Sequence, residues 1–550
     1  MNRLLIGLLF VGLAAKGQTN SDVPTNKEIS ILNIQFSNLK RSDSWLTSLN
    51  AAALTRYYAA NAAQAELSLT KAKGAFTDFS GSPDVLQADA AVEAFYRLSS
   101  RTVVYGAMSY DNFSGKDMAG SVFMPLTSHH PFDIIEDSLN NTGTKHRDTY
   151  RLTGGFGYSV SKGFSIGARL DYTAANYAKY KDLRHKNKLM DMTLTAGVTM
   201  PVGSYVQIGA NYLYRRTTES VLFSTYGKGG RNFVSFINYG PYIGQVEQFG
   251  STGFTDKSRE MPLVDDYDGA GLQLSVGSHP AWQLYNAFTY AHRRGYYGRR
   301  SPYTITFTRH ESDVYQYDAR LAHQAEKARC YLDFHLSAEN LENRLPGRLE
   351  QKNDAGATYY EYFTPVKSAN RLWVDGQVSL RADISPLSSE ALTTPGSMSA
   401  WSFEGGLRWA HHKQTAYLFP YYRRQHYTHY EPFISLTRNI AARHGVWSIQ
   451  AGASFRQGDG TPADDGTFIE PSDKQTPPPT MDTYFWRDYQ WMNAAQYEVG
   501  ASGQYSFIMP STALKTYARM SVSHRKCNER NEFTAGPDRT TATLTFGCEF

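Results

Sequence analysis

Strict alternation of apolar and polar residues recurs along this chain and constrains its fold more than any other feature. At its end, Ala542, Leu544, Phe546, Cys548 and Phe550 occupy every second position, and polar residues or glycine stand between them. Successive side chains of a β-strand point to opposite faces, so this period indicates strands with one apolar and one wet face. With 41% apolar residues, chance gives a perfect ten-residue alternation in roughly one window per thousand. Similar alternation marks the segments 149–160, 164–173, 192–200, 206–214, 330–338, 372–384, 401–409, 447–455 and 497–507.

Aromatic residues at the apolar positions separate two folds that would both alternate in this way. A large soluble β-sandwich also gives each of its strands one apolar face. Eight residues of a tilted strand, however, span on the order of 20 Å along a membrane normal, close to the apolar band between the two aromatic girdles of a membrane barrel. We therefore predict an all-β fold, a transmembrane antiparallel β-barrel. Aromatic pairs with this spacing are Tyr150 and Tyr158, Phe164 and Tyr172, Trp282 and Tyr290, Trp401 and Trp409, Trp447 and Phe455, and Tyr497 and Tyr505.

The connections between the expected strands alternate between short and long. Long connections are expected at Ser220–Gly269, Glu342–Ser368 and Gly458–Arg487. Membrane barrels have short turns on the periplasmic side and long loops outside. The barrel should cover residues 64–550 with about 18 strands, and 14 to 18 are compatible with the pattern because residues 64–126 and 414–443 are hard to divide. Short turns are expected at 161–163, 201–203, 279–280, 326–327 and 509–510.

Residues 1–17 have the parts of a secretory signal peptide. Asn2 and Arg3 form a short basic region, Leu4 to Ala15 is an apolar stretch of 12 residues, and a cut after Gly17 follows small residues. A membrane-spanning helix needs about 20 apolar residues, so this stretch is too short. Loss of Arg3 and Lys16 takes the formal charge from +5 to +3, which is too small to indicate nucleic-acid binding. We predict export to the cell outer membrane.

Residues 18–63 precede the barrel and contain a short predicted helix from Ser44 to Ala60. Together with Ala65-Glu66-Leu67, the sequence Asn50-Ala51-Ala52-Ala53-Leu54 resembles the start of long-chain fatty-acid-transporter-like barrels, in which an N-terminal segment plugs the lumen. A lead-in on the periplasmic side is the alternative to a plug. Over its full length the chain is similar to an uncharacterised outer-membrane barrel family of Gram-negative bacteria. The terminal Phe550 resembles the signal that the barrel assembly machinery recognises, which implies that machinery as a partner during biogenesis.

Charged residues at the polar positions of the strands are predicted to line the lumen. A charge that faces lipid near the midplane costs about 2–4 kcal/mol, so these side chains should point inward. Their mixed signs indicate a salt-bridge network, or a plugged or narrow pore, rather than strong ion selectivity. They either brace the wall or contact a solute. They are Arg169, Asp171, Arg215, Asp333, His335, Glu339, Arg371, Asp375, Arg381, Asp383, Glu404, Arg408, Lys515 and Arg519.

Several other motifs lack the context that their chemistry requires. Gly163-Phe164-Ser165-Ile166-Gly167 has the spelling of a hydrolase nucleophile elbow, but that motif needs a helix after the turn and Ser165 opens a predicted strand. The acidic segments 265–269 and 459–466 are predicted to lie in outer loops and do not follow a full calcium-loop pattern. We expect no catalytic, cofactor-binding or metal-binding residues, and calcium binding by outer loops stays open.

Histidines and cysteines also give no site. His129-His130, His411-His412, and His426 with His429 would each need loop geometry to hold one metal ion, because neighbours in a strand point apart. If the last two strands pair, Cys527 and Cys548 lie at opposite ends of their hairpin and are too far apart for a disulfide.

The expected function is uptake or permeation of a small solute, as a porin-like barrel or as part of an import system, without enzymatic activity. One alternative is a closed scaffold or receptor whose outer loops, such as Ser220–Gly269, dock a surface lipoprotein or ligand. Another is a barrel enzyme that uses Asp333 and His335. The lipid bilayer is the expected partner, a nutrient ligand is compatible with the pattern, and no nucleic acid is expected.

Overall fold

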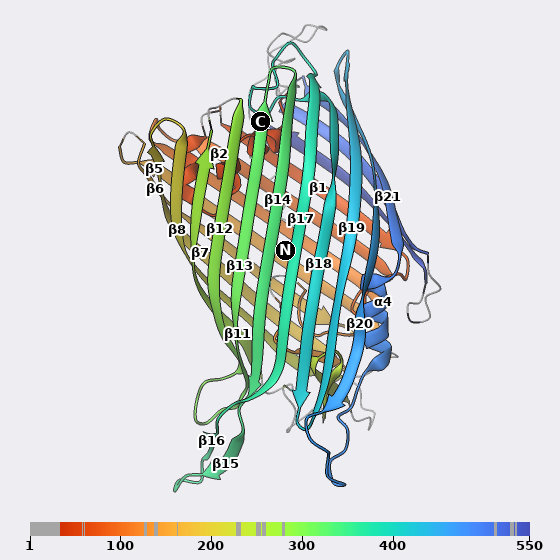
Figure 1. Cartoon of the computed structure of the whole chain (residues 1–550). Helices are drawn as coiled ribbons and strands as arrows, with labels where there is room; N and C mark the ends of the chain where they lie inside the picture. Colours follow the sequence, from red (N-terminus) through yellow and green to blue (C-terminus); the bar gives the residue numbers. More distant parts are fainter. Residues whose placement is uncertain are drawn as a thin grey trace.

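The computed structural model shows a barrel of eighteen antiparallel strands (Figure 1). It describes residues 34–57, 59, 61–125, 129–136, 141–161, 163–226, 233–248, 255, 260–277, 281–510, 514–528, 533 and 536–550. The predicted signal peptide lies outside these residues. The strands of the barrel are β1 (Ala62–Lys73), β2 (Asp84–Arg97), β3 (Thr102–Met118), β5 (Gly143–Ser159), β6 (Ser165–Lys179), β7 (Arg184–Val202), β8 (Val206–Ser224), β11 (Met261–Val276), β12 (Trp282–Gly298), β13 (Thr306–Gln324), β14 (Ala328–Leu345), β17 (Val366–Pro386), β18 (Ser399–Leu418), β19 (Tyr421–Ala442), β20 (Gly445–Thr467), β21 (Gln496–Met509), β22 (Leu514–Cys527) and β23 (Asp538–Glu549).

The sheet closes on itself between its first and last strands. Each strand pairs with the next one along the chain, and β1 pairs with β23 with Leu67 opposite Phe546. Backbone hydrogen bonds of 2.7 and 2.9 Å between Ala63 and Phe550 complete this seam. A closed sheet satisfies every backbone donor and acceptor of its strands without an open edge, as a lipid environment requires. The predicted antiparallel barrel of about 18 strands is confirmed.

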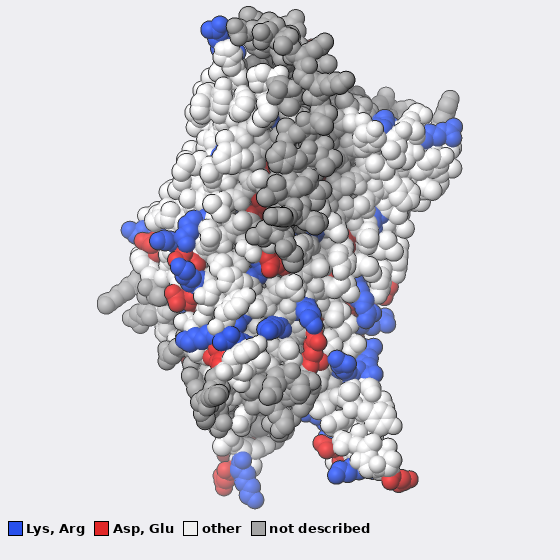
Figure 2. Space-filling model, turned by 180° about the vertical axis from the view of Figure 1, so that it is seen from behind, with Lys and Arg blue, Asp and Glu red and all other residues white. Residues whose placement is uncertain are grey.

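The apolar face of the alternation forms the outside of the barrel. Trp401 and Trp447, at the expected girdle positions, are 37% and 47% exposed, and Phe546 is 55% exposed. Seen from behind, most of the charged side chains gather in the middle and lower parts of the molecule, and the described residues above them are largely uncharged (Figure 2). An uncharged outer zone on a closed barrel is suited to hydrocarbon. The described residues contain no helix with the length and apolar character needed to cross a membrane.

The two ends of the barrel differ in their connections. Short turns, such as that from Gln324 to Ala328, lie at the end where β1 begins and β23 finishes. The predicted loop sites at 265–269 and 459–466 are wrong: the first belongs to β11 and the second to β20, which runs to Thr467. Acidic residues stand at neighbouring positions in these segments, as at Asp265 and Asp266, so alternation no longer marks the strand. Cys527 and Cys548 lie toward opposite ends of the β22–β23 hairpin, as predicted.

A small sheet and a helix lie on the lumen side of the barrel, formed by long connections. β4 (Asp133–Glu136), β9 (Val234–Gly240) and β10 (Ile243–Gln248) make a three-stranded sheet, which we call the inner sheet. Its residues Ile134 and Ile237 are fully buried in an apolar cluster with wall residues of β8, β11 and β12. Helix α4 (Asp482–Asn493) packs on the inner sheet and on β20.

Two other segments complete the fold. The hairpin of β15 (Arg348–Lys352) and β16 (Thr358–Tyr362) projects from the end with long connections (Figure 1). Before β1 come α3 (Phe36–Arg41) and the 3₁₀ turns η1 (Ser44–Thr47) and η2 (Ala51–Arg56). The single helix predicted from Ser44 to Ala60 is therefore two short turns. Asp43 and Asn50 cap them by accepting backbone hydrogen bonds and so divide the segment.

Candidate functional site

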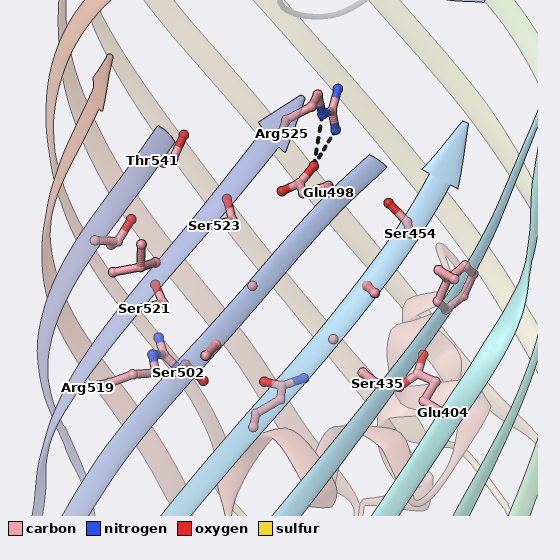
Figure 3. A pocket seen from close by; sticks show the side chains of 18 of the residues that line it. Glu404, Ser435, Ser454, Glu498, Ser502, Arg519, Ser521, Ser523, Arg525 and Thr541 are labelled. Atoms are coloured by element: carbon pink, nitrogen blue, oxygen red, sulfur yellow. Dashed lines mark hydrogen bonds and ion pairs between the residues drawn. The ribbon is translucent and has the colours of Figure 1, made fainter. Parts of the chain in front are cut away.

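The lumen contains a cavity of about 860 Å³ between the wall strands β18–β23, β1 and β2. Its lining is rich in hydroxyl groups, because serines and threonines occupy the inward positions of these strands. Figure 3 shows them along the inner wall: Ser435, Ser454, Ser502, Ser521, Ser523 and Thr541.

Six of the seven charged side chains that line the cavity lie in pairs of opposite sign, and the seventh, Asp89, accepts a hydrogen bond from Gln87 at 2.7 Å. Arg525 lies 2.6 Å from Glu498, and the two side chains point toward one another across β21 and β22 (Figure 3). Glu431 accepts from Arg408 at 2.9 Å and lies 2.7 Å from Arg456. The lining is therefore strongly polar although its charges largely neutralise one another.

A row of inward glycines receives the residues that precede the barrel. Gly157 lies opposite Gly167 across β5 and β6, and Gly167 opposite Gly197 across β6 and β7. A Cβ atom at Gly167 would stand 2.3 Å from the backbone nitrogen of Ala52, so a larger residue cannot fit while η2 is in place. The glycines thus let the backbone of η2 lie directly against the wall.

Asn50 fixes this contact with three hydrogen bonds. Its amide donates to the carbonyl oxygens of Val198 (3.0 Å) and Ala210 (3.2 Å) and to the side chain of Gln273 (2.9 Å). The Trp45 ring nitrogen donates to the Ser275 hydroxyl at 3.0 Å. These donors tie the chain to β7, β8 and β11.

The same segment also contacts the opposite part of the wall. Arg320 of β13 donates to the carbonyl oxygen of Arg41 at 3.0 Å, and Lys515 of β22 donates to that of Ile34. Lys40 forms an ion pair with Glu93 of β2. The N-terminal segment, residues 34–57, therefore lies across the lumen at the end with short turns.

A buried ionic cluster anchors the connection between β3 and β5, whose described residues 119–125 and 129–136 we call the inner loop. Arg293 has no exposed side-chain surface and lies 2.9 Å from both Asp265 and Glu339. It also donates to the backbone carbonyl of His129 at 2.8 Å. The His129 ring stacks on Trp373 at 4.0 Å. Residues of β11, β12, β14 and β17 thus hold the inner loop at His129.

Two further polar clusters bind the rest of the inner loop. Glu136 lies 2.7 Å from Lys145 and 2.7 Å from Lys179, and all three side chains are buried. Glu219 of β8 accepts from the backbone nitrogen of Met124 and from Asn187. Buried charges are tolerated only where partners replace the lost water, so these clusters specify where the inner loop sits.

Carboxylates of three connections meet beside α4. Burial raises the pKa of Asp488 to about 7, and the charge of nearby Asp78 adds to the rise. Burial also raises the pKa of Asp78 and of Asp133, while Arg487 opposes the rise at Asp78 and Asp488. The Tyr242 hydroxyl donates to Asp488 at 3.2 Å. This cluster joins α4 to the β9–β10 turn.

We predict that α4 is less protected at alkaline than at acidic pH. A raised folded pKa means that stability present below the unfolded pKa is lost as the pH rises, here between about pH 4 and pH 7, and stays constant above. Hydrogen exchange of α4, corrected for intrinsic rates, should quicken across that range, and Asp488→Asn should flatten the response. Asp473→Asn is the control. An unchanged pH response in Asp488→Asn would contradict the assignment.

Most of the predicted lumen charges lie in ion pairs within the wall. Arg371 differs, since it donates to the backbone carbonyl of His130 in the inner loop at 2.9 Å. Arg408, Glu404 and Arg519 line the cavity, and Glu339 belongs to the Arg293 cluster. The other pairs are Arg169–Asp171 (2.7 Å), Arg215–Asp191 (2.8 Å), Asp333–Arg320 (2.5 Å), His335–Asp318 (2.7 Å), Asp375–His412 (3.9 Å), Arg381–Asp383 (3.0 Å), Asp383–Arg329 (2.9 Å), Lys515–Glu549 (3.1 Å) and Arg519–Glu66 (3.3 Å).

The other motifs of the sequence take structural positions. Ser165 begins a strand, and its hydroxyl lies 3.0 Å from that of Thr55 and 3.3 Å from that of Ser159. His412 and His429, from neighbouring strands, approach with ring centroids 6.4 Å apart, which spacing along the sequence does not reveal. Among the described residues, no three metal-binding side chains gather into a possible metal site.

Sequence reasoning missed the residues that hold the lumen contents. Arg293, Glu136 and Asn50 carry the anchors, yet none of them stands out in the alternation. Glycines at inward positions of adjacent strands were a usable signal, because glycine inside a strand often marks the close approach of another backbone.

Comparisons with known proteins give one family and several distant barrels. A search of curated proteins gives no match. Over 89% of the chain, the structure is similar to BauA, the ferric preacinetobactin receptor of Acinetobacter baumannii, with 10% identity, a TM-score of 0.39 and 80% of that chain covered. It is similar to the copper transporter OprC with the same identity, score and share of this chain, and covers 81% of OprC. These likenesses are slight, and the fold follows from the strand pairing itself.

A family model covers nearly the whole chain. The family of unknown function DUF6850 matches residues 51–550, from η2 to the terminal phenylalanine. The likeness of Asn50–Leu54 to fatty-acid-transporter-like barrels stays a prediction. With a closed barrel of eighteen strands, an apolar outer surface and this match, the chain is an outer-membrane β-barrel that belongs to the DUF6850 family.

Proposed function

We propose that this barrel takes up a small polar solute across the outer membrane and that the N-terminal segment controls its passage as a plug. One observation carries the proposal: a hydroxyl-lined cavity lies inside a closed barrel whose short-turn end is crossed by residues 34–57. Of the described part of this segment, only Ile34 forms a β-bridge, to Ser397. Because side-chain contacts hold most of it, the segment can leave the lumen while the barrel stays paired.

The segment begins on the side from which an import system could act. Ile34 lies beside Lys515 at the short-turn end, which is periplasmic in an outer-membrane barrel. A periplasmic partner that acts at Ile34 would therefore meet the segment at its first described residue, and release of the segment would open the lumen toward the periplasm.

Asn50→Ala tests this proposal. The substitution removes three hydrogen bonds that hold η2 to the wall. Loss of buried hydrogen bonds costs about 1–3 kcal/mol, which shifts the balance toward a released segment by roughly fivefold or more. Proteoliposomes with the variant should swell faster than wild type in isosmotic small solutes. Asn353→Ala, in the exposed β15–β16 turn, is the control. Equal swelling rates for wild type and Asn50→Ala, both at the level of empty liposomes, would overturn the proposal.

A receptor that docks a surface partner is the second candidate. The β15–β16 hairpin projects from the barrel, and Leu349 in β15 and Phe363 just after β16 are 49% and 58% exposed. The loop expected to dock a partner, Ser220–Gly269, instead places its described residues 233–248 largely on the inner sheet. A receptor would stay closed in Asn50→Ala and co-purify with a stoichiometric partner, and removal of the exposed Phe363 ring by Phe363→Ser would abolish that co-purification.

An enzymatic role finds less support. Ser165 lacks the turn before a helix that exposes a nucleophile, and it lies under the N-terminal segment beside Thr55. His335 pairs with Asp318 of the adjacent strand at 2.7 Å, which is a wall contact between β13 and β14. Uptake is therefore the function that we propose.

A further inference from the structure

We infer that the cavity takes a neutral, polyhydroxylated solute of the saccharide or polyol class in preference to an ion of similar size. This inference rests on the proposed uptake function and assigns its substrate class. It is carried by the composition and pairing of the groups on the cavity wall.

Hydroxyl groups dominate the wall. Ten of the residues that line the cavity are serine or threonine, and they come from six different strands. Each hydroxyl can donate one hydrogen bond and accept others, so it can pair with a sugar hydroxyl in either direction. A polyol that enters the cavity therefore exchanges its hydrogen bonds to water for hydrogen bonds to the hydroxyl groups of the wall, at many successive positions.

The charges of the wall offer an ion little compensation. Glu498 is occupied by Arg525, and Glu431 receives both Arg408 and Arg456. Glu404 lies 3.7 Å from Arg381, and Arg519 lies 3.3 Å from Glu66. An anion that leaves bulk water would have to break such a pair to gain a counter-charge, and a cation would find outside these pairs only Asp89, which already accepts a hydrogen bond from Gln87. A neutral solute has no comparable cost of desolvation.

Binding in this cavity should be weak, which suits passage. Among the described residues that line it, Phe433 carries the one aromatic ring, and the Arg408 guanidinium covers that ring at 4.2 Å. No uncovered ring in the lining can stack on a sugar. The cavity volume of about 860 Å³ lies within the range of about 300–1,000 Å³ typical of small-ligand sites. A monosaccharide or short saccharide would occupy it loosely.

Swelling of proteoliposomes in three similar solutes tests the inference. With the full chain and its Asn50→Ala variant, glucose should enter at least about fivefold faster than gluconate or glucosamine. Saturation-transfer NMR on the full chain in micelles reports glucose binding independently of passage.

Variants of the cavity wall test whether its hydroxyl groups and its paired charges cause this preference. Thr541→Val with Thr543→Val keeps the side-chain shape but removes two hydroxyls, and should slow glucose entry by about threefold and weaken its saturation transfer. Thr358→Val, in β16 outside the barrel, is the matched control. Glu498→Gln leaves Arg525 without its counter-charge and should raise gluconate entry over that of glucosamine.

The outcomes separate the substrate class from the uptake function. Faster glucose entry, slowed by the paired valines, supports both. Entry of gluconate or glucosamine at the rate of glucose overturns the substrate class and leaves uptake in place. Glucose saturation transfer that the valines weaken, without swelling in any solute, supports the class and overturns uptake. Absence of both signals overturns the inference together with the proposed function.

Discussion

Gly167→Val is expected to displace the N-terminal segment and to open the lumen. A Cβ atom there would stand 2.3 Å from Ala52 N and 2.5 Å from the carbonyl carbon of Ala51, so the conflict is with backbone. Overpacking of this kind costs about 1–3 kcal/mol, which favours the released segment by roughly fivefold to a hundredfold or more. Swelling rates in neutral solutes should rise accordingly, until passage through the open barrel limits them.

Gly154→Val provides a matched control for this prediction. Gly154 lies in the adjacent strand β5, and nothing stands within 4 Å of a Cβ atom built there. Both variants place the same β-branched residue in a strand, but Gly154 lies on the outward face with Leu152 and Phe156, whereas Gly167 lies against η2. Hydrogen exchange of residues 44–56 should rise in Gly167→Val alone. If the segment keeps its protection and swelling stays unchanged, residues 51–56 do not close the lumen.

Arg293→Met is expected to lower the unfolding free energy of the barrel by about 3–5 kcal/mol. The guanidinium is fully buried between Asp265 and Glu339, and its removal leaves two carboxylates without their cation in a site closed to water. His310 already lies 2.5 Å from Asp265 in the intact protein, so its ring cannot take the place of the lost guanidinium. Urea unfolding of the folded barrel in micelles should show the shift in midpoint.

Arg408, which is half exposed, is the control that separates the effect of removing a buried charge from the effect of removing any paired arginine. The Arg408 side chain is 49% exposed and pairs with Glu431, so Arg408→Met should cost about 1 kcal/mol or less. Hydrogen exchange should also rise in the inner loop of Arg293→Met, since the carbonyl of His129 loses its donor. Equal costs for the two substitutions would refute the role of the buried cluster.

Part of the candidate site could be predicted from the sequence. The alternation places Arg408 and Arg519 on the inner face of their strands, and both line the cavity. It does not give their partners, because a period of two assigns a face and leaves open which residues of neighbouring strands meet. Glu431, the partner of Arg408, lies 23 residues further along the chain.

The sequence by itself determined the wall of this protein. Lipid outside and polar groups inside impose a local rule on every second residue, so the strands, their outer face and the barrel class can be read from segments such as 541–550. The tertiary structure decided what fills the lumen inside this wall. Asn50 meets Val198 across 148 residues and Arg293 meets Glu339 across 46, and such contacts depend on the register of the closed sheet. Short inner elements such as β4 also lack a period of their own, since apolar wall and loop surround them on all sides.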